Sequence, residues 1–304
     1  MNNIESILND IENNGYYIDS SISIDKIKKL KQEIRTIENK IKSNRIKKQK
    51  IKPNKINEIN YNSIGSKMII SYQYKEKECN NLYVDVYFPE YNWTFKHIAY
   101  SNFRTGKIKC PYEPRVCGIG YIGEGIYNSD NKPESYKHWQ HMLRRCYDSK
   151  YKFTYPTYEN VTVCNEWHNF QNFTKWFDEN YYEIPECRME LDKDILYKGN
   201  KIYSPDTCVF APQRINTLFV KCDKSRGSLP IGVTYRKDKD KYISRCRYNN
   251  KKVTLGSYDT PVEAFYAYKY FKECAIKYTA DTYIHYIPTK LYNALYNYEI
   301  EITD

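Results

Sequence analysis

Residues 230–275 constrain the fold of this chain more than any other part of the sequence. The segment reads PIGVTYRKDKDKYISRCRYNNKKVTLGSYDTPVEAFYAYKYFKECA, and its first half holds three short stretches in which apolar and polar residues alternate. Alternation with period two is typical of antiparallel strands that bury one face. One face here is mostly apolar and the other is basic. The pattern therefore predicts a three-stranded sheet with its apolar face on a core.

A helix that begins at Pro261 is expected to cover this apolar face. Thr260 suits the N-cap, Pro261 suits the first helical position, and Glu263 completes a capping box. Apolar residues then recur on one side of the helix, at Ala264, Ala267, Tyr268, Phe271 and Ala275. The opposite face of the sheet would stay open, and a basic β ribbon of this kind fits the major groove of DNA.

The same segment resembles an AP2 DNA-binding domain. The likeness rests on Gly232-Val233 near its start, on LGSY at 255–258, and on the helix rich in alanine and tyrosine. It implies that residues 227–290 bind double-stranded DNA through six strand positions, which are Thr234, Arg236, Arg245, Arg247, Lys252 and Thr254. The tryptophans common in that family are absent, and Thr254 occupies one of their positions. The resemblance therefore leaves the preferred DNA sequence open.

Residues 190–216 carry the second informative motif, ELDKDILYKGNKIYSPDTCVFAPQRIN. The motif predicts a short strand, a turn at Gly199-Asn200, a second strand and the start of a helix. Two segments with aromatic residues at helical spacing precede it, SYKHWQHMLRRCYDS and VTVCNEWHNFQNFTKWF, and we expect those aromatic residues to form core. Together, residues 134–222 resemble the HNH-like endonucleases of phages, some of which are homing enzymes.

This resemblance implies a ββα centre that binds Mg²⁺ or Mn²⁺ through Asp192 on the strand and Asn216 on the helix. The cation would neutralise charge on the scissile phosphate and stabilise the leaving oxygen. Lys193 stands where active enzymes commonly have a histidine, and a lysine with a pKa of about 10.4 is a poor general base. The implied catalytic residues are Asp192, Lys193 and Asn216. Lys193 would contact a phosphate, and His168 or Asp194 is a candidate base.

Two interpretations of the central motif therefore stay open. In the first, the chain is a metal-dependent DNA endonuclease that nicks one strand. In the second, it is a non-catalytic DNA-binding regulator on a degenerate nuclease scaffold, and residues 192–194 form a charged turn without chemistry. Binding to RNA instead of DNA is a weaker third possibility, because the phosphate contribution alone does not separate the two.

The sequence of residues 1–58 predicts a helical arm. Ile27, Leu30, Ile34, Ile37 and Ile41 recur at spacings of 3, 4, 3 and 4, which is a heptad seam of about two heptads. A basic run without acids continues from 40 to 52 and ends at Pro53. The seam favours a homodimer through residues 24–44 or packing within the chain, and the basic run could follow phosphates. A solvated helical extension and linker would explain the pattern equally well.

The remaining segments are assigned by pattern. The stretches SKMIISYQY and LYVDVYF alternate with period two and predict a small β module over 59–117. Residues 118–133 are dense in glycine and predict a linker. Their Tyr121-Ile122-Gly123 and Gly125-Ile126-Tyr127 stand in the wrong order and too close together for a GIY-YIG nuclease. Residues 291–304 are expected to form a tail, and the whole chain a multidomain α+β protein.

Composition agrees with a polyanion partner. The 304 residues contain 48 Lys and Arg against 37 Asp and Glu, a net charge of +11. The mean hydropathy of −0.81 and the lack of any apolar run of about 20 residues argue against membrane spans and a membrane partner. The start, MNNIESILND, has no signal-peptide pattern, so we expect a cytoplasmic location, in a phage-infected cell or at the nucleoid.

The ten cysteines contain no CxxC pair, so the sequence gives no signature of a structural zinc site. We expect most of them to be reduced and buried as small apolar residues. A mixed metal site formed by Cys146, Cys164, Cys208 and a nearby histidine stays open as an alternative.

Overall fold

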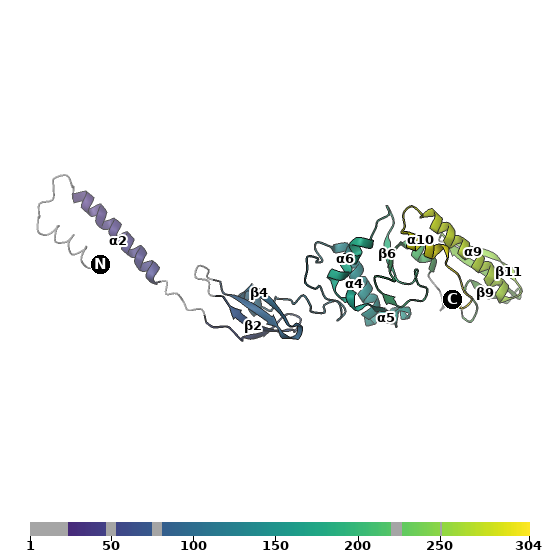
Figure 1. The fold of residues 1–304 in the computed structure, drawn as a ribbon, viewed down its shortest axis with the longest axis horizontal. Helices are drawn as coiled ribbons and strands as arrows, with labels where there is room; N and C mark the ends of the chain where they lie inside the picture. The colour runs from purple at the N-terminus through teal and green to yellow at the C-terminus, as the bar shows by residue number, and fades with distance from the viewer. Residues whose placement is uncertain (1–23, 47–52, 75–80, 220–226, 250) are drawn as a thin grey trace.

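The computed structural model describes residues 24–46, 53–74, 81–219, 227–249 and 251–304. Helices and strands are both present in it, which confirms the expected α+β class. In chain order, a long helix precedes a four-stranded sheet, then a group of helices with short strands, and then a three-stranded sheet covered by a helix (Figure 1). Among the described residues, every helix is too short or too polar to traverse a lipid bilayer.

Helix α2 (Ile24–Ile46) comes first and is followed by an antiparallel sheet. The sheet has the order β1 (Ile59–Tyr61), β2 (Lys67–Gln73), β3 (Tyr83–Phe88) and β4 (Trp93–Ala99), and α3 (Tyr100–Arg104) follows it. Alternation puts one set of side chains on the buried face, where Met68, Ile70, Val84, Val86 and Phe88 are fully buried. Phe103 of α3 completes this small core.

The central part contains α4 (Pro133–Tyr147), α5 (Ser149–Thr154) and α6 (Phe170–Asn180), with 3₁₀ turns at 156–158, 165–168 and 217–219; a further 3₁₀ turn at 89–91 joins β3 to β4. Strand β5 (Thr162–Val163) pairs in parallel with β7 (Ile202–Tyr203). Strand β6 (Met189–Asp192) pairs antiparallel with β8 (Val209–Pro212), and the short helix α7 (Gln213–Asn216) follows β8. The aromatic stripes form the core as predicted, since Trp139, Trp167, Phe170 and Phe173 are fully buried.

Residues 120–123 of the glycine-rich segment 118–133 pack against the central helices, whereas most residues from 124 to 131 are exposed. A Cβ atom on Gly120 would lie 2.4 Å from Leu143 Cδ1 and 2.8 Å from the Trp139 ring, so the backbone passes directly over α4. The Tyr121 N–H donates to the His168 carbonyl at 2.9 Å, and the Phe170 N–H donates to the Tyr121 carbonyl at 2.9 Å. Glycine at 120 reflects this close approach to α4.

The C-terminal part has the three predicted strands in the order β11–β10–β9, all antiparallel. They are β9 (Val233–Arg236), β10 (Lys241–Tyr248) and β11 (Lys251–Tyr258), and α9 (Pro261–Thr282) follows. The capping box is present, because the Glu263 N–H donates to Thr260 Oγ1 and the Thr260 N–H donates to the Glu263 carboxylate, both at 3.2 Å. Helix α9 buries Ala264, Phe265 and Tyr268 against the sheet.

The last residues also differ from the expected tail. Helix α10 (Thr289–Tyr296) packs beside α9, and Leu291, Leu295 and Ile300 are buried. The Lys269 amine donates to the Ile300 carbonyl at 2.7 Å, which fixes the chain beyond α10. The central and C-terminal parts share one continuous hydrophobic core, and the β1–β4 sheet has its own.

Candidate nuclease centre and nucleic-acid interface

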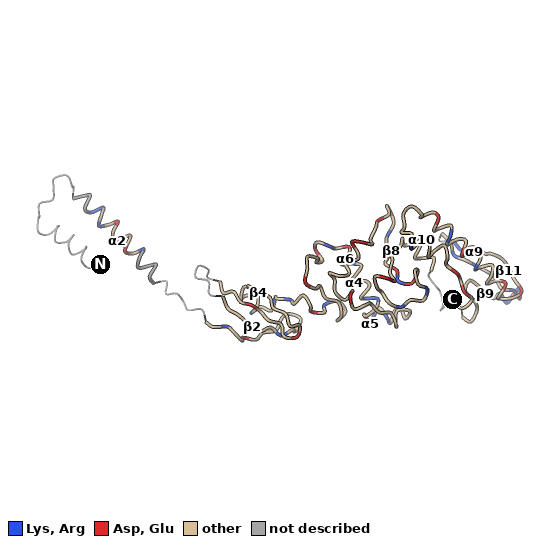
Figure 2. The backbone as a smooth tube through the Cα atoms, viewed as in Figure 1, with Lys and Arg blue, Asp and Glu red and all other residues tan. Residues whose placement is uncertain are grey.

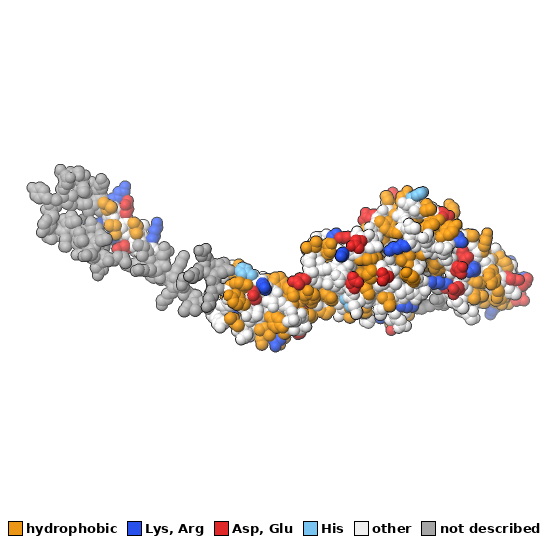
Figure 3. All heavy atoms as spheres, viewed as in Figure 1, with side chains coloured by type: hydrophobic (Ala, Val, Ile, Leu, Met, Phe, Trp, Pro, Cys, Tyr) orange, Lys and Arg blue, Asp and Glu red, His pale blue; other side chains and the backbone are white. Residues whose placement is uncertain are grey.

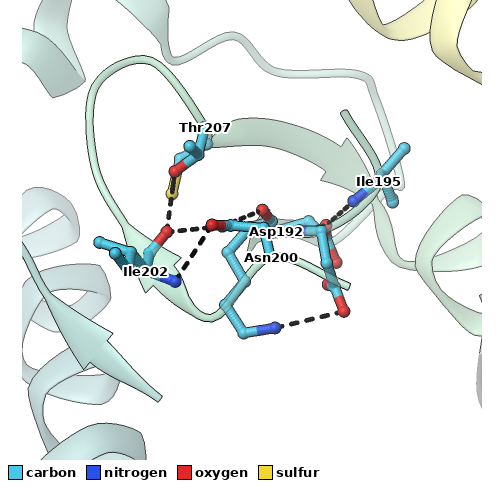
Figure 4. A network of polar contacts seen from close by, with 8 residues as sticks. Asp192, Ile195, Asn200, Ile202 and Thr207 are labelled. Carbon is cyan, nitrogen blue, oxygen red and sulfur yellow. Dashed lines mark hydrogen bonds and ion pairs between the residues drawn. The ribbon is translucent and has the colours of Figure 1, made fainter. Parts of the chain in front are cut away.

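Asp192 ends β6, directly opposite Val209 of β8. Its Oδ1 atom accepts hydrogen bonds from the backbone N–H groups of Asp194 at 2.8 Å and Ile195 at 2.7 Å (Figure 4). A short acidic side chain that binds backbone N–H groups two and three residues ahead forms a tight local turn. This turn stops the strand and fixes the position of the Asp192 carboxyl group.

The environment of Asp192 changes its ionisation. The residue is 9% exposed, and burial, reinforced by the neighbouring Asp194 charge, raises the pKa of its carboxyl group to about 6. The two backbone hydrogen bonds and the Lys193 charge act in the opposite direction without cancelling the shift. A buried carboxyl that titrates near neutral pH is a feature of functional sites, although structural charges also produce it.

Lys193 is also buried, with 8% of its surface exposed. Its amine lies 3.2 Å from Asp194 Oδ2, and Asp194 itself is exposed. The pair compensates the buried positive charge. The amine is therefore held by a carboxylate of the same turn.

Asn200 is a site residue that the sequence analysis treated only as part of a turn. Its Nδ2 group donates to the carbonyl of Lys193 and to that of Ile202, both at 2.7 Å. Thr207 Oγ1 donates to the same Ile202 carbonyl at 2.8 Å (Figure 4). Gly199 precedes Asn200 and has a φ of +81°, a conformation that lets the chain reverse direction there. Asn200 thus ties the residue after Asp192 to the strand β7.

Asp192, Lys193 and Asp194 lie in one turn. No described hydrogen bond or ion pair joins Asn216 to this turn. Asn216 ends α7, which follows Pro212, and Pro212 lies opposite Met189 at the far end of β6 from Asp192. Helix α7 packs against β6 and β8. No hydrogen bond described for residues 189–216 joins Asn216 to Asp192.

The oxygen atoms of the 192–194 turn fit a divalent cation only in part. The described residues hold no group of three His, Cys, Asp or Glu side chains suited to a metal. Mg²⁺ often binds to one or two carboxylates and takes its other ligands from water and phosphate. Asp192 Oδ2 and the Asp194 carboxylate could supply such ligands, and Asp194 would first have to leave Lys193.

The other candidates from the sequence, His168, Cys146 and Cys208, form no described hydrogen bond or ion pair with residues 192–194. His168 Nε2 lies 3.3 Å from the Tyr147 hydroxyl, and burial lowers the pKa of the imidazole. Burial raises the pKa of Cys146 and of Cys208 to about 12. Both thiols are therefore protonated at neutral pH in the metal-free protein.

The C-terminal sheet places the six predicted DNA-facing residues on one face. Residues directly opposite each other in an antiparallel pair share a face. The register pairs Arg245 with Thr254 and Arg247 with Lys252; nearer the other end, Thr234 lies opposite Ile243 and Arg236 opposite Lys241. The alternate residues Val233, Ser244 and Cys246 are buried on the side of α9. The six side chains therefore lie on the face away from α9.

Charge is unevenly distributed over this face. The Arg236 guanidinium binds the Asp238 carboxylate through two contacts of 3.0 and 2.7 Å, and Lys241 pairs with Asp259. Within the described residues, no ion pair engages Arg245, Arg247 or Lys252. Figure 2 shows the basic and acidic residues of β9 to β11. The uncompensated cations lie on β10 and β11, toward the turn that joins these strands.

A further contact joins this sheet to the candidate centre. The Arg214 guanidinium of α7 donates to Asn249 Oδ1 at 2.9 Å, and Asn249 lies in the turn after β10. The sequence analysis missed both residues, because nothing local indicates that α7 and this turn meet. This hydrogen bond fixes the turn between β10 and β11, and the uncompensated cations beside it, to α7.

No protein-family model matches this chain. Comparison with curated proteins and with solved structures also finds no match.

Proposed function

We propose that this chain binds double-stranded DNA through the exposed face of β9, β10 and β11. The observation that carries the proposal is the placement of Arg245, Arg247 and Lys252 side by side on a face that α9 leaves open. Lysine and arginine bind phosphates, and an arginine can also donate two hydrogen bonds to a guanine edge in the major groove. Thr234, Arg236 and Thr254 complete the proposed interface.

We further propose that the bound DNA is cleaved at the 192–194 turn with the help of Mg²⁺ or Mn²⁺, as in HNH endonucleases of mobile elements. The cation would neutralise charge on the scissile phosphate when bound. Asp192 and Asp194 would be the ligands, and Lys193, released from Asp194, would contact a phosphate. The Asn216 ligand that the resemblance implies would require α7 to move, because α7 follows the end of β8 farthest from Asp192. The buried, perturbed carboxyl group of Asp192 supports this proposal.

A non-catalytic DNA-binding regulator is the second candidate function. It is favoured by Lys193 at the position where a histidine base is common, and by the ion pair that holds Lys193 to Asp194. Both candidates require the same DNA-binding face. They differ only in the fate of the DNA strand.

A binding assay tests the interface. Replacing Arg247 and Lys252 with alanine should weaken binding to a mixed set of duplex oligonucleotides by roughly tenfold or more, and should reduce the salt dependence by about two counterions. Lys175→Ala on α6 is the control, because Lys175 is exposed on another element. Unchanged affinity in the double variant would disprove the interface. Stronger binding to duplex RNA at the same salt concentration would point to the RNA alternative.

A cleavage assay separates nuclease from regulator. Supercoiled plasmid incubated with the protein and Mg²⁺ or Mn²⁺ should become nicked, and Asp192→Ala should abolish nicking while DNA binding persists. Asp178→Asn is the control, since Asp178 is a surface residue of α6 that pairs with Lys132. Tight binding by the unmodified chain without any nicking would support the regulator instead.

A further inference from the structure

Helix α2 exposes an apolar seam that nothing in the described chain covers. Leu30 is 50% exposed and Ile37 is 55% exposed, and Ile34 between them is half-buried. Figure 3 shows hydrophobic, basic and acidic side chains together on the described surface of this helix. Apolar residues at heptad spacing on an isolated helix usually pack against a second helix.

The charges beside the seam are arranged in a definite order. Ile27 and Ile34 are the a positions of two successive heptads. Lys31 and Glu38 are the e positions of these heptads and lie on one flank of the seam. Glu33 and Lys40 occupy the g positions on the other flank. Each flank therefore carries one acid and one base, in opposite order along the helix. Charges at e and g set the orientation and the partner of a coiled coil.

We propose that α2 pairs with α2 of a second copy of this chain as an antiparallel coiled coil centred between Ile34 and Ile37. In that arrangement g positions face g positions and e positions face e positions. Glu33 then faces Lys40 of the partner subunit, and Lys31 faces the partner's Glu38. Two-fold symmetry repeats both contacts, so four opposite-charge pairs flank the central layers.

Other arrangements bring like charges together. In a parallel pair the g residue faces the e residue of the next heptad, so Glu33 would face the partner's Glu38. Sliding one antiparallel helix by seven residues would place Glu33 opposite its own copy, or Lys40 opposite its own copy. The charge pattern therefore selects one direction and one register from the seam.

One substitution distinguishes the antiparallel from the parallel dimer, because it changes the dissociation constant in opposite directions. In the antiparallel dimer, Glu33→Lys faces the partner's Lys40, and sedimentation equilibrium of the full chain at low salt should show a dissociation constant about three- to tenfold higher. In a parallel dimer the same variant would face Glu38 and tighten association. The double variant Glu33→Lys with Lys40→Glu should restore the original constant.

Two further variants make the test complete. Gln32→Lys with Asn39→Lys adds the same +2 charge on the outer side of the helix, and should change the constant little. Ile34→Asp places a charge in the central layer and should leave the protein monomeric. The proposal is overturned if the unmodified chain is monomeric at every concentration, if Glu33→Lys tightens the dimer, or if Ile34→Asp leaves association unchanged.

Discussion

Asp192, Lys193 and Asp194 place three ionisable groups in consecutive positions, and the first two are almost fully buried. A buried charge is costly unless hydrogen bonds or an opposite charge compensate it. Lys193 is paired with Asp194, whereas Asp192 accepts two backbone N–H groups and has the Lys193 charge nearby, which together do not offset its burial. The remaining cost is visible as the raised pKa of Asp192.

Asp192→Asn should therefore stabilise the fold at pH 8, by about 1 to 3 kcal/mol in urea unfolding. The folded protein holds the Asp192 proton more tightly than the unfolded chain does, so ionisation destabilises the fold. This penalty is complete above the folded pKa of about 6 and shrinks as the pH falls toward the ordinary value of 3.8. The advantage of asparagine should accordingly be smaller at pH 5.

The surface variant Asp178→Asn serves as the control and should show no such difference between the two pH values. An Asp192→Asn protein that is less stable than the original at pH 8 would contradict the prediction. Greater stability together with loss of nicking would identify Asp192 as a residue kept for chemistry at the expense of the fold.

At the level of single residues, the sequence indicated the type of chemistry at Asp192 but not which side chains and backbone groups lie next to it in space. Asp192 was found because its motif is local. Asn200 was not, because its role is to bind main-chain carbonyl groups, which no residue pattern displays. The ion pair of Lys193 likewise depends on side-chain orientation, and orientation follows from packing.

At the level of elements, prediction succeeded where local rules decide. Period-two alternation gave the correct faces of β9 to β11, and Thr260, Pro261 and Glu263 gave the start of α9. Local rules do not show that parts of 118–133 and 291–304, such as Gly120 and Leu291, pack on other helices. A glycine-rich or tyrosine-rich stretch does not reveal by itself whether a distant surface will receive it.

Removal of the N-cap of α9 tests whether the capping box stabilises this helix. Thr260→Ala loses the hydrogen bond from the Glu263 N–H, and the free energy of unfolding should fall by about 1 kcal/mol in urea titrations. Thr282→Ala is the control. It removes a hydroxyl from the other end of the same helix, where Thr282 Oγ1 donates to the Tyr278 carbonyl at 2.8 Å. An equal loss in both variants would mean that capping is not the cause.

At the level of the whole molecule, two separate cores predict two unfolding events. One core belongs to the β1–β4 sheet, and the other extends from Val116 to Ile300. Val86→Ala should lower the stability of the first unit by about 1 to 3 kcal/mol, and Leu143→Ala should lower that of the second by about 2 to 5 kcal/mol. Hydrogen exchange resolved by segment measures both changes separately.

A single cooperative transition, shifted by both variants, would contradict this division. The sequence predicted separate units for 134–222 and 227–290, yet these residues share one core and the Arg214 to Asn249 hydrogen bond. A change in composition suggests a boundary between units, but it does not show whether the two units share a hydrophobic core.

The end of the described chain is fastened to the loop that follows Asp192. The Lys198 amine donates to the Glu299 carbonyl at 3.0 Å and to Asp304 Oδ2 at 2.7 Å. A purification handle or fluorescent fusion joined after Asp304 would pull on this anchor and, through it, on the loop. Handles for biochemical work therefore belong before α2, where they would leave the loop undisturbed.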